Sequence, residues 1–236
     1  IGTATAANGL AFIASNDDFF ANFAKWGASQ GAGSSGAPSS NYLRAAWTTG
    51  LIPGFDSAIG FQLWTGTSAV DASATNPPAS LTGSPFITGV VDTKASAIDA
   101  QMMGDVGSMP LLVVASWAKA PTGAANTNPN FFNQGAYDRS SFNIAAELGV
   151  IPNKATLQLG FRNAKSGGAI DGPGLTTGGN ATDNAILVGA TYNLALNVRL
   201  ELTYSKYSGD VYNSNYSIAP GYMGDNMTML DLAFGL

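Results

Sequence analysis

The feature that most constrains the fold is a regular alternation of short and long connections between segments with strand-like patterns. These segments come in pairs: 42–51 with 57–65, 95–105 with 109–118, 140–151 with 154–165, and 184–193 with 197–208. Few residues separate the two members of a pair. The connections between successive pairs are long and rich in Gly, Asn, Thr, Ser and Pro, which are typical loop residues. This layout predicts antiparallel hairpins that follow one another along the chain.

Apolar and polar residues alternate with a period of two inside these segments. In 197–205, Val198, Leu200 and Leu202 share one parity, whereas Arg199 and Glu201 have the other. The segments 141–150 and 154–163 repeat the pattern. Since successive side chains of a strand point to opposite faces, each segment has one apolar and one polar face.

The composition separates the possible classes of β protein. Charged residues make up only 11% of the chain, about half of the usual share of roughly 25%. The longest charge-free apolar run, 106–118, is interrupted by Gly107 and Pro110, and it is shorter than the roughly 20 residues of a transmembrane helix. Such a composition is shared by transmembrane β-barrels and by secreted β-sandwiches or β-helices. The alternating connections favour the barrel, in which periplasmic turns are short and extracellular loops are long.

We therefore predict an all-β fold, an antiparallel up-and-down transmembrane β-barrel in the bacterial outer membrane. One domain covers 1–236 and contains about ten strands: 9–15, the four pairs, and 226–236. An even number of strands would bring both termini to the same side. Four aromatic residues fall toward strand ends, as in the aromatic girdles of such barrels: Trp47, Trp117, Tyr192 and Tyr204.

The segment 17–27 follows another pattern. Phe19, Phe23 and Trp26 lie four and seven residues apart, Asn16 can cap a helix, and Gly27 can end it. The spacing predicts a short amphipathic helix over 17–27, folded into the pore mouth or lying at the membrane interface. The alternative is another strand.

The last residues of the chain also alternate, with apolar side chains on every second position. We expect this strand to close the barrel against an earlier one. Apolar residues at the last, third-last and fifth-last positions resemble the C-terminal signal that the outer-membrane assembly machinery recognises: Leu232, Phe234 and Leu236. Leu236 departs from the usual terminal Phe.

Charged residues on the polar parity are the candidate functional residues. In a wide barrel they would line water and tune the selectivity for ions or solutes, and in a narrow barrel they would pair into a plug. The predicted pore-lining residues are Arg44, Asp99, Asp105, Glu147, Lys154, Arg162, Arg199, Glu201 and Asp231.

Several stretches resemble the porin region of the fused cytochrome-porin outer-membrane proteins associated with iron oxidation. They include "NYLRAAWTTG", "VVDTKASAIDAQMMGDVGSMPL", "AAELGVIPNKATLQLGFR" and "DNAILVGATYNLALNVRLELTYSKYSG". The resemblance implies a haem-bearing segment with a C-x-x-C-H motif ahead of a barrel of about sixteen strands. This chain has neither Cys nor His, so haem is expected only on a missing segment or a partner. The chain is then a smaller relative or part of a larger barrel.

Other chemistries are excluded. Without His there is no Ser-His-Asp triad, and no paired carboxylates, phosphate loop or metal-ligand spacing is found, so we expect no catalytic residue, metal site or cofactor in this chain. A net charge of −5 argues against nucleic acid as a partner.

Three functions remain: a passive pore for small hydrophilic solutes or ions, the sheath of an electron conduit, and a structural or adhesive surface barrel. The expected partners are outer-membrane lipid and lipopolysaccharide, the assembly machinery, and a periplasmic cytochrome or further copies of the chain.

Overall fold

Twelve β-strands and no helix make up the part of the chain that the computed structural model describes, which is residues 6–29, 38–50, 52–69, 90–122, 130–133, 137–165, 167, 180–210 and 226–234. The strands are β1 (Ala6–Ser15), β2 (Phe19–Ser29), β3 (Ser40–Thr49), β4 (Phe55–Ala69), β5 (Val90–Asp92), β6 (Ala95–Val106), β7 (Met109–Ala120), β8 (Arg139–Ile151), β9 (Ala155–Lys165), β10 (Thr182–Ala195), β11 (Val198–Ser208) and β12 (Met227–Phe234). The described residues contain no helix that is long and apolar enough to cross a membrane.

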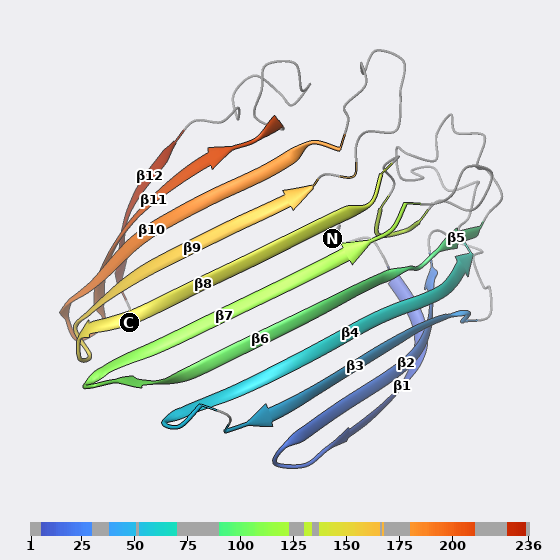
Figure 1. Cartoon of the computed structure of the whole chain (residues 1–236), viewed down its shortest axis with the longest axis horizontal. Coiled ribbons are helices and arrows are strands. Elements are labelled where there is room, and N and C mark those ends of the chain that lie inside the picture. Colours follow the sequence, from blue (N-terminus) through green and yellow to red (C-terminus); the bar gives the residue numbers. More distant parts are fainter. Residues whose placement is uncertain are drawn as a thin grey trace.

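The strands form one sheet in which neighbours in sequence are neighbours in space (Figure 1). The order runs from β1 to β12, except that the short β5 pairs only with β4 at the side of this path. Every pair of neighbouring strands is antiparallel. The predicted all-β, up-and-down antiparallel fold class is therefore confirmed.

Short turns lie along one end of the sheet and long connections along the other (Figure 1). Asn153 in the β8–β9 turn and Asn197 in the β10–β11 turn have φ values of 58° and 64°. Asparagine tolerates this left-handed conformation better than most residues do, which explains why these tight hairpins carry it.

The predicted helix over 17–27 is wrong, because this segment forms the β1–β2 turn and strand β2. The Asn16 side-chain oxygen accepts hydrogen bonds from the N–H groups of Asp18 and Phe19, at 3.0 and 2.7 Å, and so turns the chain back on itself. Phe19 and Phe23 are four residues apart, and this spacing places two side chains on one face of a helix or of a strand. The apolar spacing thus did not distinguish the two structures.

The strand count and the closure also differ from the expectation. With β2, the sheet order from β1 to β12 contains eleven strands besides β5. Because this number is odd, β1 begins at the end of the sheet with the long connections, whereas β12 ends at the end with the short turns. The two strand ends are on opposite sides of the sheet. β12 pairs with β11 and with no other described strand, so β1 and β12 are the edges of an open, curved sheet.

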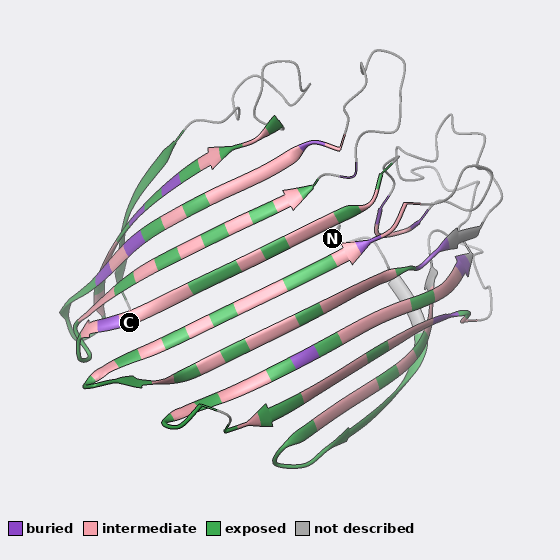
Figure 2. Ribbon diagram, in the orientation of Figure 1, coloured by how far each residue is buried: buried purple, intermediate pink, exposed green. Residues whose placement is uncertain are grey.

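The two faces of the sheet differ in chemistry, and exposure alternates along the strands (Figure 2). On one face, Thr191, Thr203 and Ser205 are only 9%, 7% and 5% exposed although they are small and polar. In a single curved layer such crowding occurs on the inner side, so we call this polar face the concave face. The opposite, convex face exposes large apolar side chains, such as Leu159 at 60% and Leu230 at 65%.

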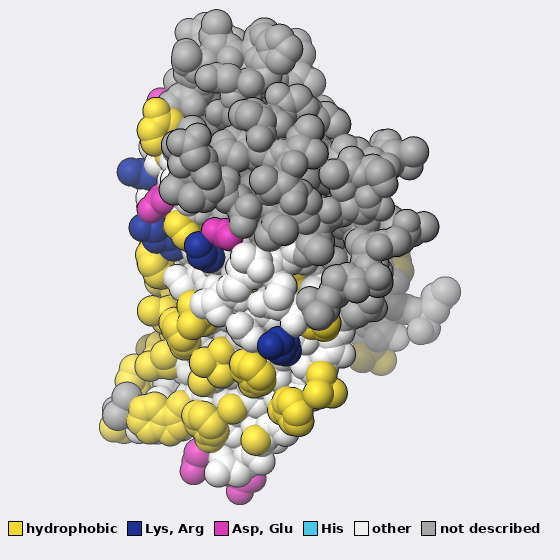
Figure 3. All heavy atoms as spheres, turned by 90° about the vertical axis from the view of Figure 1, so that its right-hand side faces the viewer, with side chains coloured by type: hydrophobic (Ala, Val, Ile, Leu, Met, Phe, Trp, Pro, Cys, Tyr) yellow, Lys and Arg dark blue, Asp and Glu magenta, His cyan; other side chains and the backbone are white. Residues whose placement is uncertain are grey.

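The described residues contain almost no buried apolar core. Only Ala120 and Ala181 are buried apolar residues among them. Hydrophobic side chains gather instead on the outer surface (Figure 3). The convex face includes the four predicted girdle aromatics, with Trp47 and Tyr192 nearer the short turns and Trp117 and Tyr204 nearer the long connections.

Candidate functional site

The candidate functional site is the concave face, where the strand register brings polar side chains into rows. Asp99, Ser116, Asn143 and Arg162 stand opposite one another on the four successive strands β6 to β9. Neighbouring strands are about 4.8 Å apart, so the backbones of Asp99 and Arg162 are separated by about 14 Å. These four residues and Gln101 contribute to the lining of a hollow of about 450 Å³ on the concave face.

One ion pair lies at the side of this hollow toward β3. The Arg44 guanidinium donates two parallel hydrogen bonds to the Asp99 carboxylate, at 3.0 and 3.1 Å. The Gln62 amide donates a third to Asp99 at 3.0 Å and accepts one from the Tyr42 hydroxyl at 3.2 Å. The side chains of Arg44 and Asp99 are 30% and 34% exposed, so water reaches the pair.

A second ion pair lies on the other side of the hollow. Arg162 Nη2 is 2.6 Å from Asp183 Oδ1, and the two side chains are 35% and 31% exposed. Between the two pairs, the Asn143 amide donates a hydrogen bond to the Ser141 hydroxyl at 3.0 Å. This half of the concave face, nearer the long connections, therefore presents two half-exposed ion pairs with neutral polar groups between them. Arg139, at the start of β8, adds a positive charge at its edge.

The half nearer the short turns is more acidic. Gln158 donates to Glu147 at 3.4 Å, and Arg199 lies 2.8 Å from Glu201 on the same strand. Asp231 stands directly opposite Glu201 on the neighbouring strand. The described concave residues of this half carry five carboxylates and one guanidinium, a formal net charge of −4: Asp56, Asp105, Glu147, Glu201, Asp231 and Arg199.

Eight of the nine predicted pore-lining residues project from the concave face of the strands. Lys154 lies instead in the β8–β9 turn, where its Nζ is 5.3 Å from the centroid of the Tyr192 ring on the convex face. The prediction missed Asp56 and Asp183, and also Arg139, the first residue of β8. Asp56 shares its parity with Gln62, but the predicted strand began only at residue 57, and Asp183 lay in a segment assigned to a connection.

A cluster of aromatic rings covers the concave face near the long connections. Trp26, Tyr42 and Trp64 come from strands β2, β3 and β4, whereas Phe131 and Phe132 come from the β7–β8 connection. Ring centroids are 6.3 Å apart for Trp26 and Phe131, 5.3 Å for Phe131 and Phe132, and 5.5 Å for Phe132 and Trp64. The Tyr42 ring continues the series at 5.0 Å from Trp64. Phe131 and Phe132 of this connection therefore pack against the inside of the sheet.

Two buried asparagines hold the connection in place. Asn130, 1% exposed, accepts a hydrogen bond from the Lys94 N–H at 3.2 Å and donates to the carbonyls of Lys94 and Pro121 at 2.7 and 2.6 Å. Asn133, 2% exposed, donates to the carbonyls of Ala120 and Tyr137 at 3.0 and 2.7 Å. Residues that sequence analysis assigned to a loop thus shape the entrance of the concave face, and their only signal was the pair of adjacent phenylalanines.

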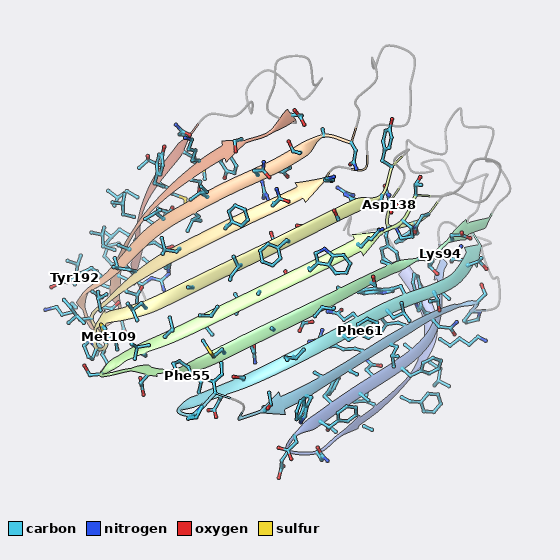
Figure 4. All side chains as sticks on the ribbon, in the orientation of Figure 1. Phe55, Phe61, Lys94, Met109, Asp138 and Tyr192 are labelled. Carbon is cyan, nitrogen blue, oxygen red and sulfur yellow. The ribbon has the colours of Figure 1, made fainter. Side chains whose placement is uncertain are left out.

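Asp138 joins the two ends of the same connection. Its carboxylate lies 2.6 Å from Lys119 Nζ and accepts a hydrogen bond from the Thr122 N–H at 3.1 Å. The hydrogen bond from Lys119, followed by that from Thr122, lowers the pKa of Asp138 from its ordinary value. Lys94 and Asp138 both lie at this end of the sheet (Figure 4). At the β11 end, hydrogen bonds from the backbone and side chain of Thr182 lower the pKa of Asp210.

The concave face offers charges and hydrogen-bonding groups in contact with water. Among the described residues, no group of three or more Asp or Glu side chains is placed to hold a metal ion. The arrangement can solvate polar solutes and ions and can orient dipolar ones in the field between its ion pairs.

Comparison with known proteins gives a likeness in fold. No protein-family model matches the chain, and no curated protein sequence matches it. Among solved structures, it is similar to OmpT (in-vitro folded), an outer membrane protein of Vibrio cholerae, with a TM-score of 0.44 and 13% identity over 89% of this chain and 57% of that chain. It is also similar to the outer-membrane expressed OmpT of Vibrio cholerae, with a TM-score of 0.42 and 15% identity over 84% of this chain and 53% of that one. The chain spans just over half the length of each of these proteins.

Proposed function

We propose that the chain forms the wall of a water-filled pore in the bacterial outer membrane that passes small hydrophilic solutes or ions. The observation that carries the proposal is the pairing of a convex face of exposed Leu, Ile, Val and Phe with a concave face of half-exposed ion pairs. Passage through such a pore needs neither a catalytic residue nor a cofactor.

The convex face supports the membrane location. A water-soluble protein rarely exposes so continuous an apolar surface, whereas hydrocarbon is its natural solvent. Ten of the eleven long strands contain ten or more residues, and a tilted strand crosses a bilayer with about 9–11. Outer-membrane lipid around this face, and the machinery that inserts barrel proteins, are the partners that this location requires.

The concave charges support a preference for cations. The two ion pairs beside the hollow are internally neutral, whereas the half near the short turns has a formal net charge of −4 among its described residues. A solute that crosses the pore therefore passes a region of negative potential, which raises the local concentration of cations.

Conductance of the full protein in a planar bilayer, under a KCl gradient, tests the proposal. We expect open-channel current with a reversal potential that shows a preference for K⁺. Arg162→Gln should increase this preference while the heat-modifiable gel shift of the folded protein persists, because the half-exposed Asp183 that loses its partner stays in contact with water. Arg162→Lys is the matched control that keeps the charge. A folded protein that carries no current, with or without these changes, would contradict the pore and favour a surface scaffold.

A further inference from the structure

The charged residues of the eleven long strands are segregated between the two faces. All seven described carboxylates of these strands project from the concave face: Asp56, Asp99, Asp105, Glu147, Asp183, Glu201 and Asp231. All four lysines of these strands project from the convex face: Lys25, Lys119, Lys165 and Lys206. The convex face of the described strands thus carries positive side chains and no negative ones.

The four lysines occupy one end of the sheet. Each lies within the last five residues of a strand that leads into a long connection, namely β2, β7, β9 and β11. Each also follows an exposed aromatic residue on the same convex face: Phe23 before Lys25, Trp117 before Lys119, Phe161 before Lys165 and Tyr204 before Lys206. The apolar surface therefore ends in aromatic rings and then in ammonium groups, in the same order on four strands.

Most of this positive charge has no counter-charge from the described residues. Lys119 pairs with Asp138, but Lys25, Lys165 and Lys206 have no ion pair with any described residue. The neighbouring convex positions carry neutral polar groups, such as Asn163 and Asn184, which are hydrogen-bonded to each other at 2.7 Å. The end of the convex face near the short turns differs in this respect. Its Lys154 belongs to the β8–β9 turn, and the Lys154 Nζ lies 5.3 Å from the centroid of the Tyr192 ring.

We propose that Lys25, Lys165 and Lys206 form a belt that binds the phosphate-bearing headgroups of lipids in the leaflet that meets the long connections. This inference rests on the proposed membrane location and adds a lipid class and a leaflet to it. A four-carbon lysine stem at these positions can lie along the apolar surface and carry its ammonium outward to the headgroup level. Because the lysines are confined to one end, the attraction favours anionic lipid in that leaflet over the other.

Native mass spectrometry of the full protein in neutral detergent tests the belt. The probes are phosphatidylglycerol and, as the uncharged comparison, phosphatidylcholine with the same acyl chains. We expect the protein to retain phosphatidylglycerol preferentially. The affinity for phosphatidylglycerol should fall about fivefold for each of Lys25→Gln, Lys165→Gln and Lys206→Gln, while phosphatidylcholine retention stays the same. Lys154→Gln is the matched control and should bind as the unchanged protein does.

Further variants separate folding from binding. The triple Lys→Arg variant keeps the charges and should retain the lipid, and the heat-modifiable gel shift verifies that each variant is folded. Phosphatidylglycerol retention that is unaltered in the folded triple Lys→Gln variant, or that falls equally in Lys154→Gln, would overturn the belt. Neither result affects the conductance measurement, so failure of the belt and failure of the pore are distinguishable.

Discussion

Arg44 on β3 and Asp99 on β6 form a two-bond ion pair although β4 lies between their strands. The residue of β4 opposite Asp99 is Gly60. A Cβ atom at Gly60 would collide with the Asp99 carboxylate. The missing side chain of β4 thus provides the space through which Asp99 reaches Arg44 and anchors the row of polar groups on the concave face.

Gly60→Ala should therefore displace the Asp99 carboxylate and weaken its pair with Arg44. We expect a loss of about 1 kcal/mol in the free energy of unfolding, at the low end for overpacking because the half-exposed carboxylate can move into water. This loss is measured as a decrease in the midpoint of thermal unfolding, with the heat-modifiable gel shift as the signal. Gly50→Ala is the matched control, since a Cβ there meets no atom within 4 Å. If Gly60→Ala costs as much in an Asp99→Ala background, where the colliding carboxylate is absent, the collision with Asp99 is not its cause.

The hairpins could be predicted because their signals are local. A strand with one apolar face shows a period of two in its own sequence, as 197–205 does, and a short turn between two such strands leaves little choice of partner. The polar parity likewise placed Arg44, Asp99 and Arg162 on one face before their partners were known. The charges of the concave face follow from the pattern of each strand taken alone.

The rest of the site depends on contacts between distant segments. No local pattern shows that Phe131 and Phe132 pack against Trp26 and Trp64, because those contacts join the β7–β8 connection to β2 and β4. β2 itself was mistaken for a helix because a four-residue spacing of phenylalanines fits both structures. Which charges pair on the concave face depends on strand register, which the sequence of a single strand does not determine.

Asn130→Ala should release the β7–β8 connection from the concave face. The change removes side-chain hydrogen bonds to the backbone of Lys94 and Pro121 and leaves those buried groups unsatisfied, at a local cost of about 1 to 3 kcal/mol. We expect faster proteolysis within residues 121–138 with little change in the thermal unfolding of the sheet. Asn163→Ala, which removes an exposed hydrogen bond on the convex face, is the control. Equal proteolysis rates in the two variants would show that Asn130 does not hold the connection.

Acidification should loosen the same connection at Asp138. Because the folded-state pKa of Asp138 is below its ordinary value of 3.8, the carboxylate stabilises the fold above pH 3.8, and this contribution is lost as the pH falls through the lowered pKa. We expect the NMR signal of the Thr122 amide, which donates to this carboxylate, to titrate with a midpoint below 3.8. Asp138→Asn should abolish that titration. A midpoint at or above 3.8 would contradict the role of the hydrogen bonds from Lys119 and Thr122.

Strand β12 carries the change from the apolar convex face to the polar concave face within three residues. Leu232 and Phe234, 48% and 68% exposed, lie on the convex face of β12, whereas Ala233 between them stands opposite Arg199 on the concave face. A charge that faces hydrocarbon costs about 2 to 4 kcal/mol for Arg or Lys at the midplane and less for Asp or near the interface. Leu232→Asp together with Phe234→Asp should therefore prevent assembly, both through this cost and through loss of the apolar terminal pattern.

Ala233→Asp adds the same carboxylate one residue away, beside a guanidinium and in contact with water, so it should assemble normally. The heat-modifiable band of the folded protein on cold gels reads out both variants, and membrane fractionation shows whether the chain inserts. Normal assembly of the Leu232 and Phe234 variant would count against hydrocarbon at the convex face. Equal failure of Ala233→Asp would show that β12 tolerates no added charge on either face. We do not expect this result, because β12 already carries the exposed Asp231 on its concave face.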